Sequence, residues 1–281
     1  MTTPSSRASP GSFPSIAFIG GGNMCSAIVG GLVRQGIPAE RITVVEPFEA
    51  ARQRLREQFD VRLLASASSA LDGVAMVVWA IKPQAFHDAA TAVAPYTPHA
   101  LHLSVAAGIR TGSMAQWLGT EHIVRAMPNT PALVGSGMTG LFARAGVSDV
   151  QKLLVEQVIG ATGQFLWVQR EAHLDAVTAL SGSGPAYVFY FLEAMAQAGA
   201  DMGLSSDQAY QLAVATFVGA SHLAAHSSEP SGVLRERVTS KGGTTHAALE
   251  SMHASGVAAH FIAAMRAAEQ RATELGDEFG G

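Results

Sequence analysis

The sequence is poor in three features, and each shortage excludes a class of protein. Cys25 is the only cysteine among 281 residues, which excludes an intramolecular disulfide and a cysteine-rich metal site and fits a reducing cytoplasm. No apolar run approaches the roughly 18 residues that a membrane span requires. Charged residues make up 14% of the chain, against about 25% in an average globular protein. We therefore expect other subunits to cover much of the surface.

Basic charge is also scarce, which narrows the choice of partner. The formal net charge is −4, so the chain has no positive field to attract nucleic acid or an acidic membrane surface. None of the ten histidines belongs to a His-Glu-x-x-His pattern, and we predict no metal site. Residues 1–14 lack the apolar core of a signal peptide and are expected to form a disordered leader. A small-molecule substrate and a cytoplasmic location follow from these exclusions.

The two halves of the chain follow different patterns. Short β-branched runs alternate with helical patterns over residues 15–168, which predicts a Rossmann-type, doubly wound parallel sheet in an α/β domain. Ala-rich helical patterns then occupy residues 169–281, which predicts an all-α domain. The predicted strands after the first are Ile42–Glu46, Val74–Ala80, Ala100–Val105, His122–Ala126 and Phe165–Val168. The predicted helices of the second half span about 171–182, 185–202, 205–226, 243–254 and 256–275, and residues 276–281 are expected to fray.

A glycine loop follows the first apolar run. The sequence reads Ile19-Gly20-Gly21-Gly22-Asn23-Met24 and continues into a helical pattern. A strand, a glycine turn and a helix in this order suit a dinucleotide pyrophosphate, because glycines allow close backbone approach and the helix N-terminus faces the phosphates. Cys25 takes the third position of the glycine fingerprint, where we expect a small packing residue. The loop predicts a nicotinamide dinucleotide as cofactor.

Glu46 ends the second predicted strand, 26 residues after Gly20. A carboxylate near this spacing can accept hydrogen bonds from the ribose hydroxyls of NADH and would repel the 2′-phosphate of NADPH. The alternative is a solvated carboxylate in a turn. Arg52 and Arg54 follow on the next predicted helix and could neutralise a phosphate. The choice between NADPH and NADH therefore stays open.

Two further segments follow predicted strands at the same edge of the sheet. Ala80-Ile81-Lys82-Pro83 comes after one strand, and Val105-Ala106-Ala107 comes at the end of the next. Ligands of open α/β sheets bind at the carboxyl ends of the strands. Small residues there would let a nicotinamide ring lie flat, although small residues also simply end strands.

A second glycine turn lies in the helical half. Ser240-Lys241-Gly242-Gly243-Thr244-Thr245 runs directly into a helical pattern. Free amides at a helix N-terminus carry partial positive charge and favour an anion. The turn therefore predicts a site for a small carboxylate.

The sequence also lacks the usual groups of several hydride-transfer enzymes. No tyrosine has a lysine four positions later, and Lys241 is the only lysine of the helical half. Dehydrogenases of hydroxy acids normally need a strong general base. A protonated cyclic imine is already an electrophile and needs mainly orientation and proximity to the hydride.

The chain resembles the pyrroline-5-carboxylate reductase family from about Ile16 to Leu275. Beyond the glycine loop, the resemblance rests on Ala80–Pro83, Met127–Pro131, Leu180–Tyr187 and Val238–Leu249. It implies reduction of 1-pyrroline-5-carboxylate to L-proline with NADPH or NADH, the last step of proline biosynthesis. It further implies that the helical half is a dimerisation domain and that the active site lies at the interface of a homodimer or larger homo-oligomer.

The resemblance also implies that Ile19–Met24, Ala80–Pro83 and Val105–Ala107 line the cofactor, and it assigns the substrate residues. It implies that the Gly243 and Thr244 amides and the Ser240 hydroxyl hold the substrate carboxylate, and that the catalytic Thr245 contacts the ring nitrogen. His253 and Lys241 depart from the family pattern. Two alternatives stay open: a related imine or β-hydroxyacid oxidoreductase, which the lack of lysine in residues 170–240 disfavours, and a non-catalytic redox sensor that binds the dinucleotide.

Overall fold

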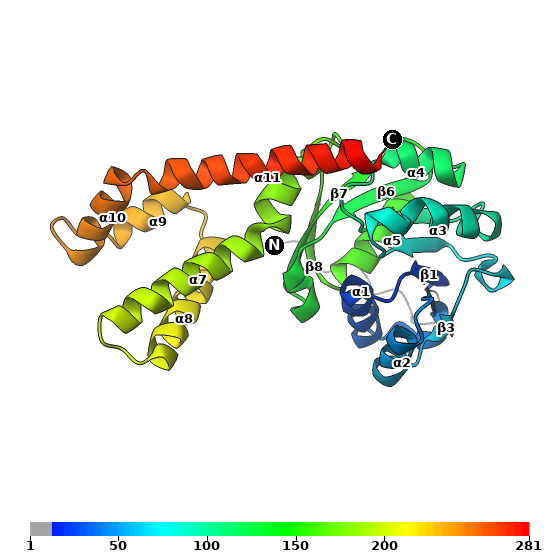
Figure 1. Ribbon diagram of the computed structural model, residues 1–281, viewed down its shortest axis with the longest axis horizontal. Coiled ribbons are helices and arrows are strands. Elements are labelled where there is room, and N and C mark those ends of the chain that lie inside the picture. The colour runs from blue at the N-terminus through cyan, green and yellow to red at the C-terminus, as the bar shows by residue number, and fades with distance from the viewer. Residues whose placement is uncertain (1–12, 281) are drawn as a thin grey trace. The chain divides into compact units, whose positions relative to one another are not determined.

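The computed structural model describes residues 13–280 (Figure 1). They form two compact units, which we call the sheet unit and the helical unit. Of the described residues, the sheet unit contains 13–183 and 268–280, and the helical unit is Gly184–Ala267. The predicted division after Val168 does not coincide with this boundary. Residues 1–12 of the predicted leader lie outside the described residues, and Phe13 is buried in the core.

An eight-stranded sheet forms the centre of the sheet unit, in the order β3-β2-β1-β4-β5-β6-β7-β8. Its strands are β1 Ile16–Ile19, β2 Ile42–Val45, β3 Arg62–Leu64, β4 Met76–Trp79, β5 Leu101–Ser104, β6 Ile123–Met127, β7 Gly137–Ala143 and β8 Gly163–Trp167. Strands β1 to β6 are parallel, which confirms the predicted Rossmann-type fold. The sequence prediction missed β3 and β7.

The end of the sheet departs from a purely parallel arrangement. Strand β7 runs antiparallel to β6, and β8 runs parallel to β7. Residues 128–136 connect β6 to β7, which is fewer than the dozen or so that a parallel crossover needs. The α5 helix between β7 and β8 provides such a crossover, so those two strands are parallel to each other.

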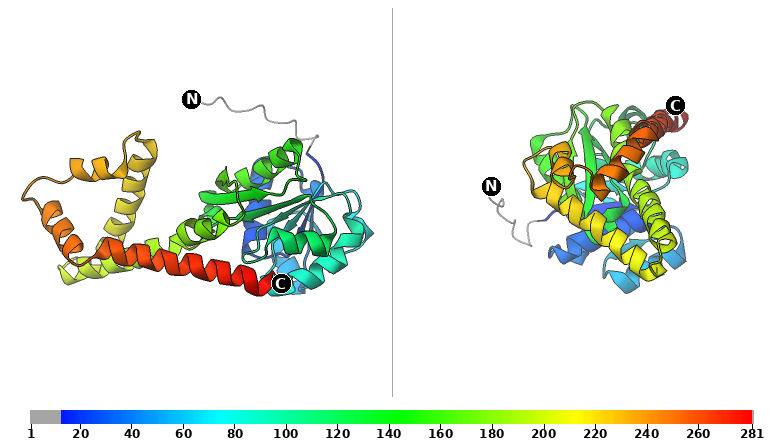
Figure 2. Two further views of the ribbon diagram at one scale, coloured as in Figure 1. Left: turned by 90° about the horizontal axis from the view of Figure 1, so that it is seen from above. Right: turned by 90° about the vertical axis from the view of Figure 1, so that its left-hand side faces the viewer.

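Helices cover both faces of the sheet (Figures 1 and 2). One face carries α1 (Asn23–Arg34), α2 (Glu49–Gln58) and α5 (Asp149–Gly160), and the other carries α3 (Phe86–Val93) and α4 (Thr111–Leu118). Each face of the sheet packs against its helices in a separate hydrophobic core. Alternate residues of each strand contribute to the two cores, because successive side chains point to opposite faces. Short 3₁₀ turns lie at Ala39–Arg41, Ser69–Leu71, Pro83–Ala85, Ala94–Tyr96 and Thr130–Val134.

The segment after β8 belongs to the sheet unit because it packs on β7. Helix α6 (His173–Val177) continues into a π-helical turn at Thr178–Gly182. A Cβ atom at Gly140 of β7 would lie 2.8 Å from the Val177 side chain. This close packing holds α6 against the sheet and explains why the compact unit extends beyond Val168.

The C-terminal turns of α11 (Val257–Phe279) also belong to the sheet unit. The predicted fraying from Gly276 is wrong, since the helix continues to Phe279 and Gly276 is buried. Arg110 Nη2 lies 2.6 Å from Asp277 Oδ1, and Phe279 packs against the core beneath α3 and α4. These contacts supply the tertiary stabilisation that the isolated tail sequence lacks.

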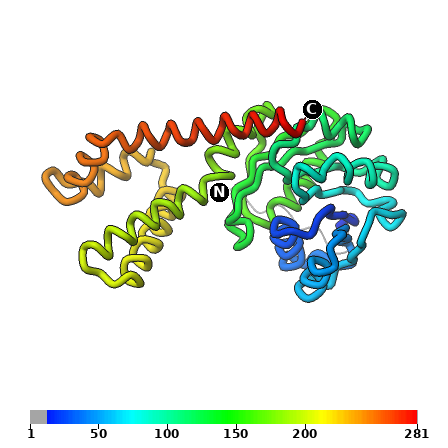
Figure 3. Tube along the Cα trace, in the orientation of Figure 1, coloured from blue at the N-terminus to red at the C-terminus, as the bar shows by residue number. Residues whose placement is uncertain are grey.

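The helical unit contains α7 (Gly184–Asp201), α8 (Ser206–His226), α9 (Ser231–Arg237), α10 (Thr244–Ala254) and the beginning of α11. Helices α7 and α8 form a hairpin that can be followed in Figure 3. Gly199 and Ala209 allow close approach, and only Ala209 and Ala213 of α8 are buried. Helix α9 was not predicted. None of the helices within residues 13–280 is long and apolar enough to span a membrane.

Candidate functional site

The glycine loop joins β1 to α1 in a geometry that fits a bound anion. Gly20 has φ +94°, and a Cβ atom there would lie 2.6 Å from the Ala80 carbonyl oxygen, so glycine is required at this position. Gly22 is the N-cap of α1, and no side chain of the described residues caps it. A Cβ atom at Gly22 would have no atom within 4 Å. The space beside Gly22 is therefore open, and the uncapped first turn of α1 can bind a pyrophosphate.

The other predicted cofactor segments lie beside this loop. The Ala80 amide donates to the Ile19 carbonyl oxygen at 2.8 Å, and the Val105 amide donates to the Trp79 carbonyl oxygen at 3.1 Å. Lys82 is exposed at the start of the Pro83–Ala85 turn. The structure thus brings Ile19–Met24, residues 80–83 and residues 105–107 together at the carboxyl ends of the neighbouring strands β1, β4 and β5.

Glu46 lies directly against the glycine loop. Its Oε2 accepts a hydrogen bond from the Gly21 amide at 2.7 Å, and its Oε1 accepts one from the Phe48 amide at 2.9 Å. The residue is only 7% exposed. The alternative of a solvated turn carboxylate is therefore wrong. Glu46 ties the end of β2 to the backbone of the loop.

Cys25, in the first turn of α1, is fully buried among side chains of the core. Burial raises the pKa of its thiol, and the nearby Glu46 carboxylate raises it further, so the reactive thiolate is disfavoured. This agrees with a packing role. Among residues 13–280, no group of three or more His, Cys, Asp and Glu side chains could hold a metal ion.

The second glycine turn leads into α10 of the helical unit. Gly242 has φ +74°, and Gly243 is the N-cap of α10, where no side chain of the described residues provides a cap. A Cβ atom at Gly243 would overlap the Ser240 hydroxyl, which shows how closely that hydroxyl approaches the helix start. The Gly243 amide already donates to the Ser240 carbonyl oxygen at 3.0 Å. Thr245 is half-buried and Thr244 is exposed beside it.

Comparisons with known proteins identify the family. A family model described as pyrroline-5-carboxylate reductase dimerisation matches residues 171–275, and one described as NADP oxidoreductase, coenzyme F420-dependent, matches residues 15–108. The pyrroline-5-carboxylate reductase of Pseudomonas aeruginosa is 43% identical over 271 residues, covering 96% of this chain and 99% of that protein. The chain belongs to the pyrroline-5-carboxylate reductase family. The resemblance read from the sequence is confirmed.

Solved structures of the reductase family share the whole architecture. The pyrroline-5-carboxylate reductase of Coxiella burnetii superimposes with a TM-score of 0.89 at 36% identity, covering 94% of this chain and 99% of that one. The Plasmodium falciparum pyrroline carboxylate reductase, which was solved with NADP bound, gives a TM-score of 0.83 at 27% identity, covering 94% of this chain and 98% of that one. The similarity spans both compact units of this reductase family member.

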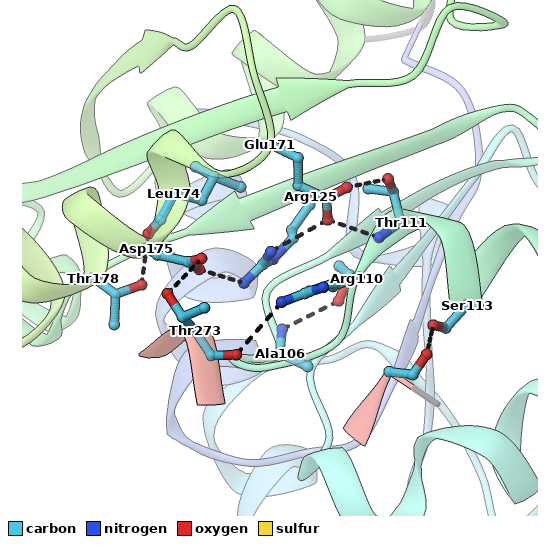
Figure 4. Close-up of polar contacts among 12 residues, drawn as sticks. Ala106, Arg110, Thr111, Ser113, Arg125, Glu171, Leu174, Asp175, Thr178 and Thr273 are labelled. Carbon is cyan, nitrogen blue, oxygen red and sulfur yellow. Dashed lines mark hydrogen bonds and ion pairs between the residues drawn. The ribbon is translucent and has the colours of Figure 1, made fainter. Parts of the chain in front are cut away.

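Sequence reasoning missed a buried polar network in the sheet unit (Figure 4). Arg125 of β6 is 3% exposed, and its guanidinium lies 3.2 Å from Glu171 Oε1 and 3.7 Å from Asp175 Oδ1. The Thr111 amide donates to Glu171 Oε1 at 2.7 Å, and the Thr273 hydroxyl of α11 donates to Asp175 Oδ2 at 3.3 Å. The sequence held one signal of this network: a lone arginine lies within an apolar strand, and two carboxylates spaced i and i+4 follow downstream.

Asn129 connects two segments that carry the family resemblance. Its Oδ1 accepts from the Met138 amide at 3.0 Å, and its Nδ2 donates to the Ser181 hydroxyl at 3.2 Å. The loop after β6 is thereby fixed to the π-helical turn. This contact gives Ser181 a structural role.

Proposed function

We propose that this chain reduces 1-pyrroline-5-carboxylate to L-proline with NADPH or NADH, the last step of proline biosynthesis. It is then an oxidoreductase acting on a CH–NH bond. The observation that carries the proposal is a pair of uncapped helix starts, α1 after Gly20–Gly22 and α10 after Ser240–Gly243. One suits a pyrophosphate and the other a small carboxylate. Membership of the reductase family supports the same reaction.

Residues of the sheet unit bind and orient the dinucleotide. When bound, the cofactor supplies the hydride that reduces the imine carbon. The first-turn amides of α1 bind the pyrophosphate, and the exposed Lys82 adds positive charge nearby. Ala106 and Ala107 leave room for a flat nicotinamide ring. The proposed cofactor residues are Ile19, Gly20, Gly21, Gly22, Asn23, Met24, Glu46, Ala80, Ile81, Lys82, Pro83, Val105, Ala106 and Ala107.

Residues at the start of α10 bind the substrate. We assign the carboxylate to the Ser240 hydroxyl and to the amides of Gly243 and Thr244. The Gly243 amide donates to the Ser240 carbonyl oxygen, so in the bound state it would share its hydrogen between two acceptors or leave the turn. Thr245 is the proposed catalytic residue, whose hydroxyl contacts the ring nitrogen and orients the imine. A protonated imine needs no further strong acid, and no metal is assigned.

The helical unit is suited to association with a second copy. Along α8 of the single chain, Leu212 is 57% exposed, Val218 54% and Leu223 71%. These apolar side chains project from more than one side of α8, and a helix that is apolar on several sides is normally buried. The matching family model is a dimerisation model. We propose a homodimer or a larger homo-oligomer with the active site at the dimer interface.

We also propose that the protein works in the cytoplasm on a small molecule, without nucleic acid or a membrane as partner. Its only cysteine is buried and unpaired, and a reducing compartment keeps such a thiol reduced. The net charge of −4 provides no attraction for phosphate backbones.

The reaction is tested by following the oxidation of NADH and NADPH from the absorbance at about 340 nm, with and without pyrroline-5-carboxylate. Proline is then identified as the product. Substrate-dependent oxidation with proline formation is expected. Dinucleotide binding without turnover would contradict the proposed reaction and favour the redox-sensor alternative. Turnover of another imine or hydroxy acid alone would favour the related oxidoreductases.

The Thr245→Ala variant tests the assignment of the catalytic residue. Because a positioned hydroxyl at the reacting atom contributes mainly in the transition state, we expect kcat to fall by about 100-fold. The dissociation constant of the dinucleotide should stay unchanged. Thr245→Ser should restore much of the activity, and the surface variant Thr91→Ala, whose hydroxyl bonds only within α3, is the matched control. An equal loss in cofactor binding would contradict this role.

A further inference from the structure

The contacts of Glu46 bear on which of the two dinucleotides the site favours. Both carboxylate oxygens already accept backbone hydrogen bonds, from the Gly21 and Phe48 amides. Each carboxylate oxygen can accept about two hydrogen bonds, so the group keeps capacity for further donors. The hydrogen bond from the glycine loop fixes the position of the carboxylate. In that position it can accept hydrogen bonds from the two hydroxyls of a ribose diol.

Arg52, the nearest candidate for neutralising a phosphate, is already engaged. Its Nη1 donates to the Glu46 carbonyl oxygen at 2.6 Å and to the Pro47 carbonyl oxygen at 2.8 Å. Its Nη2 pairs with the Glu49 carboxylate, and the side chain is 14% exposed. The guanidinium therefore binds the backbone between β2 and α2 and pairs with Glu49.

Arg54 cannot take the place of Arg52. The two residues are two positions apart on α2 and project about 200° apart around the helix axis. Since Arg52 lies on the side that contacts the Glu46 backbone, Arg54 projects from the opposite flank. The surroundings of the Glu46 carboxylate therefore contain a fixed negative charge and no free guanidinium on that side.

We infer that Glu46 makes this enzyme prefer NADH to NADPH. The adenosine ribose of a dinucleotide lies at the end of the second strand in this fold, beside the Glu46 carboxylate. The 2′- and 3′-hydroxyls of NADH can donate to that carboxylate, whereas a 2′-phosphate brings like charge against it in a partly buried site. This inference rests on the proposed function and adds the cofactor preference, which the match to an NADP oxidoreductase model leaves undecided.

Dissociation constants of NADH and NADPH, measured by calorimetry without substrate, test the inference. For the wild-type protein we expect NADH to bind about tenfold more tightly or better. Glu46→Ser removes the charge and makes space, and should lower the NADPH-to-NADH ratio of dissociation constants at least about tenfold. Glu46→Gln removes the charge alone and should give a smaller decrease. Glu57→Gln removes an exposed carboxylate of α2, the helix that follows Glu46, and should leave the ratio unchanged.

The outcomes separate this inference from the proposed reaction. Equal or tighter binding of NADPH by the wild-type protein, or an unchanged ratio in folded Glu46→Ser, would overturn the preference even if the enzyme forms proline. Tighter binding of NADH without turnover would uphold the preference and contradict only the reaction. Circular dichroism shows whether each variant is folded, and the wild-type ratio remains decisive if Glu46→Ser is not.

Discussion

Replacement of Arg125 by Met should strongly destabilise the sheet unit. The guanidinium is 3% exposed and faces two carboxylates, Glu171 and Asp175. Breaking a buried ion pair from one side costs about 3–5 kcal/mol, because it leaves uncompensated buried charge. The two carboxylate side chains are 22% and 13% exposed and keep some contact with water. We therefore expect a loss near the lower end, about 3 kcal/mol in the free energy of unfolding.

Urea denaturation followed by tryptophan fluorescence measures this loss. Every variant is compared at one protomer concentration, because the stability of an oligomer depends on it. Arg271→Met is the control: its guanidinium is 52% exposed and pairs with Glu274 and Glu278 on the surface of α11. Exposed pairs contribute little, so this variant should unfold like the wild-type protein.

A triple variant separates the charge effect from the packing effect. In Arg125→Met/Glu171→Gln/Asp175→Asn the carboxylates are neutral, and Thr111 and Thr273 can still donate to the amide oxygens. If uncompensated charge causes the loss, the triple variant should be more stable than Arg125→Met alone. The reasoning is refuted if Arg125→Met is as stable as Arg271→Met, or if the triple variant is the least stable of all.

Two further predictions concern pH and assembly. Burial lowers the pKa of His102 from 6.5 to about 4. Between these pH values the unfolded chain therefore binds a proton that the folded chain does not. The contribution to the free energy of unfolding is full above pH 6.5, and up to about 3 kcal/mol is lost on acidification to pH 4. Denaturation at a series of pH values should show a shallower decline for His102→Asn, which can still accept from Trp79, and equal slopes would contradict this assignment. Leu223→Asp places a charge at an exposed apolar position of α8 and should reduce the mass measured by light scattering to that of one chain. Ser228→Asp should keep the wild-type mass, and an assembled Leu223→Asp would argue against this interface.

Local sequence patterns predicted a large part of the fold. The apolar run before Gly20 and the helical pattern after Gly22 specify the first strand, loop and helix with few long-range contacts, because glycine and periodicity act over a few residues. The helices at 184–201 and 206–226 were found within one residue or so for the same reason. Strand β7 was missed because its two glycines interrupt the β-branched pattern, and its reversed direction depends on the short connection from β6.

The sequence alone determined the order of the elements, the two glycine turns and the family, because each depends on residues that are close together in the chain. Only the tertiary structure decided where Glu46 and Arg52 direct their polar atoms, because a carboxylate next to a loop can face solvent or the backbone with the same sequence. It also decided that Arg125 meets Glu171 and Asp175, in a network that continues from Asp175 to Thr273 of α11. Those partners are 46 to 148 residues away, and only the packing of a strand against two helices makes them neighbours.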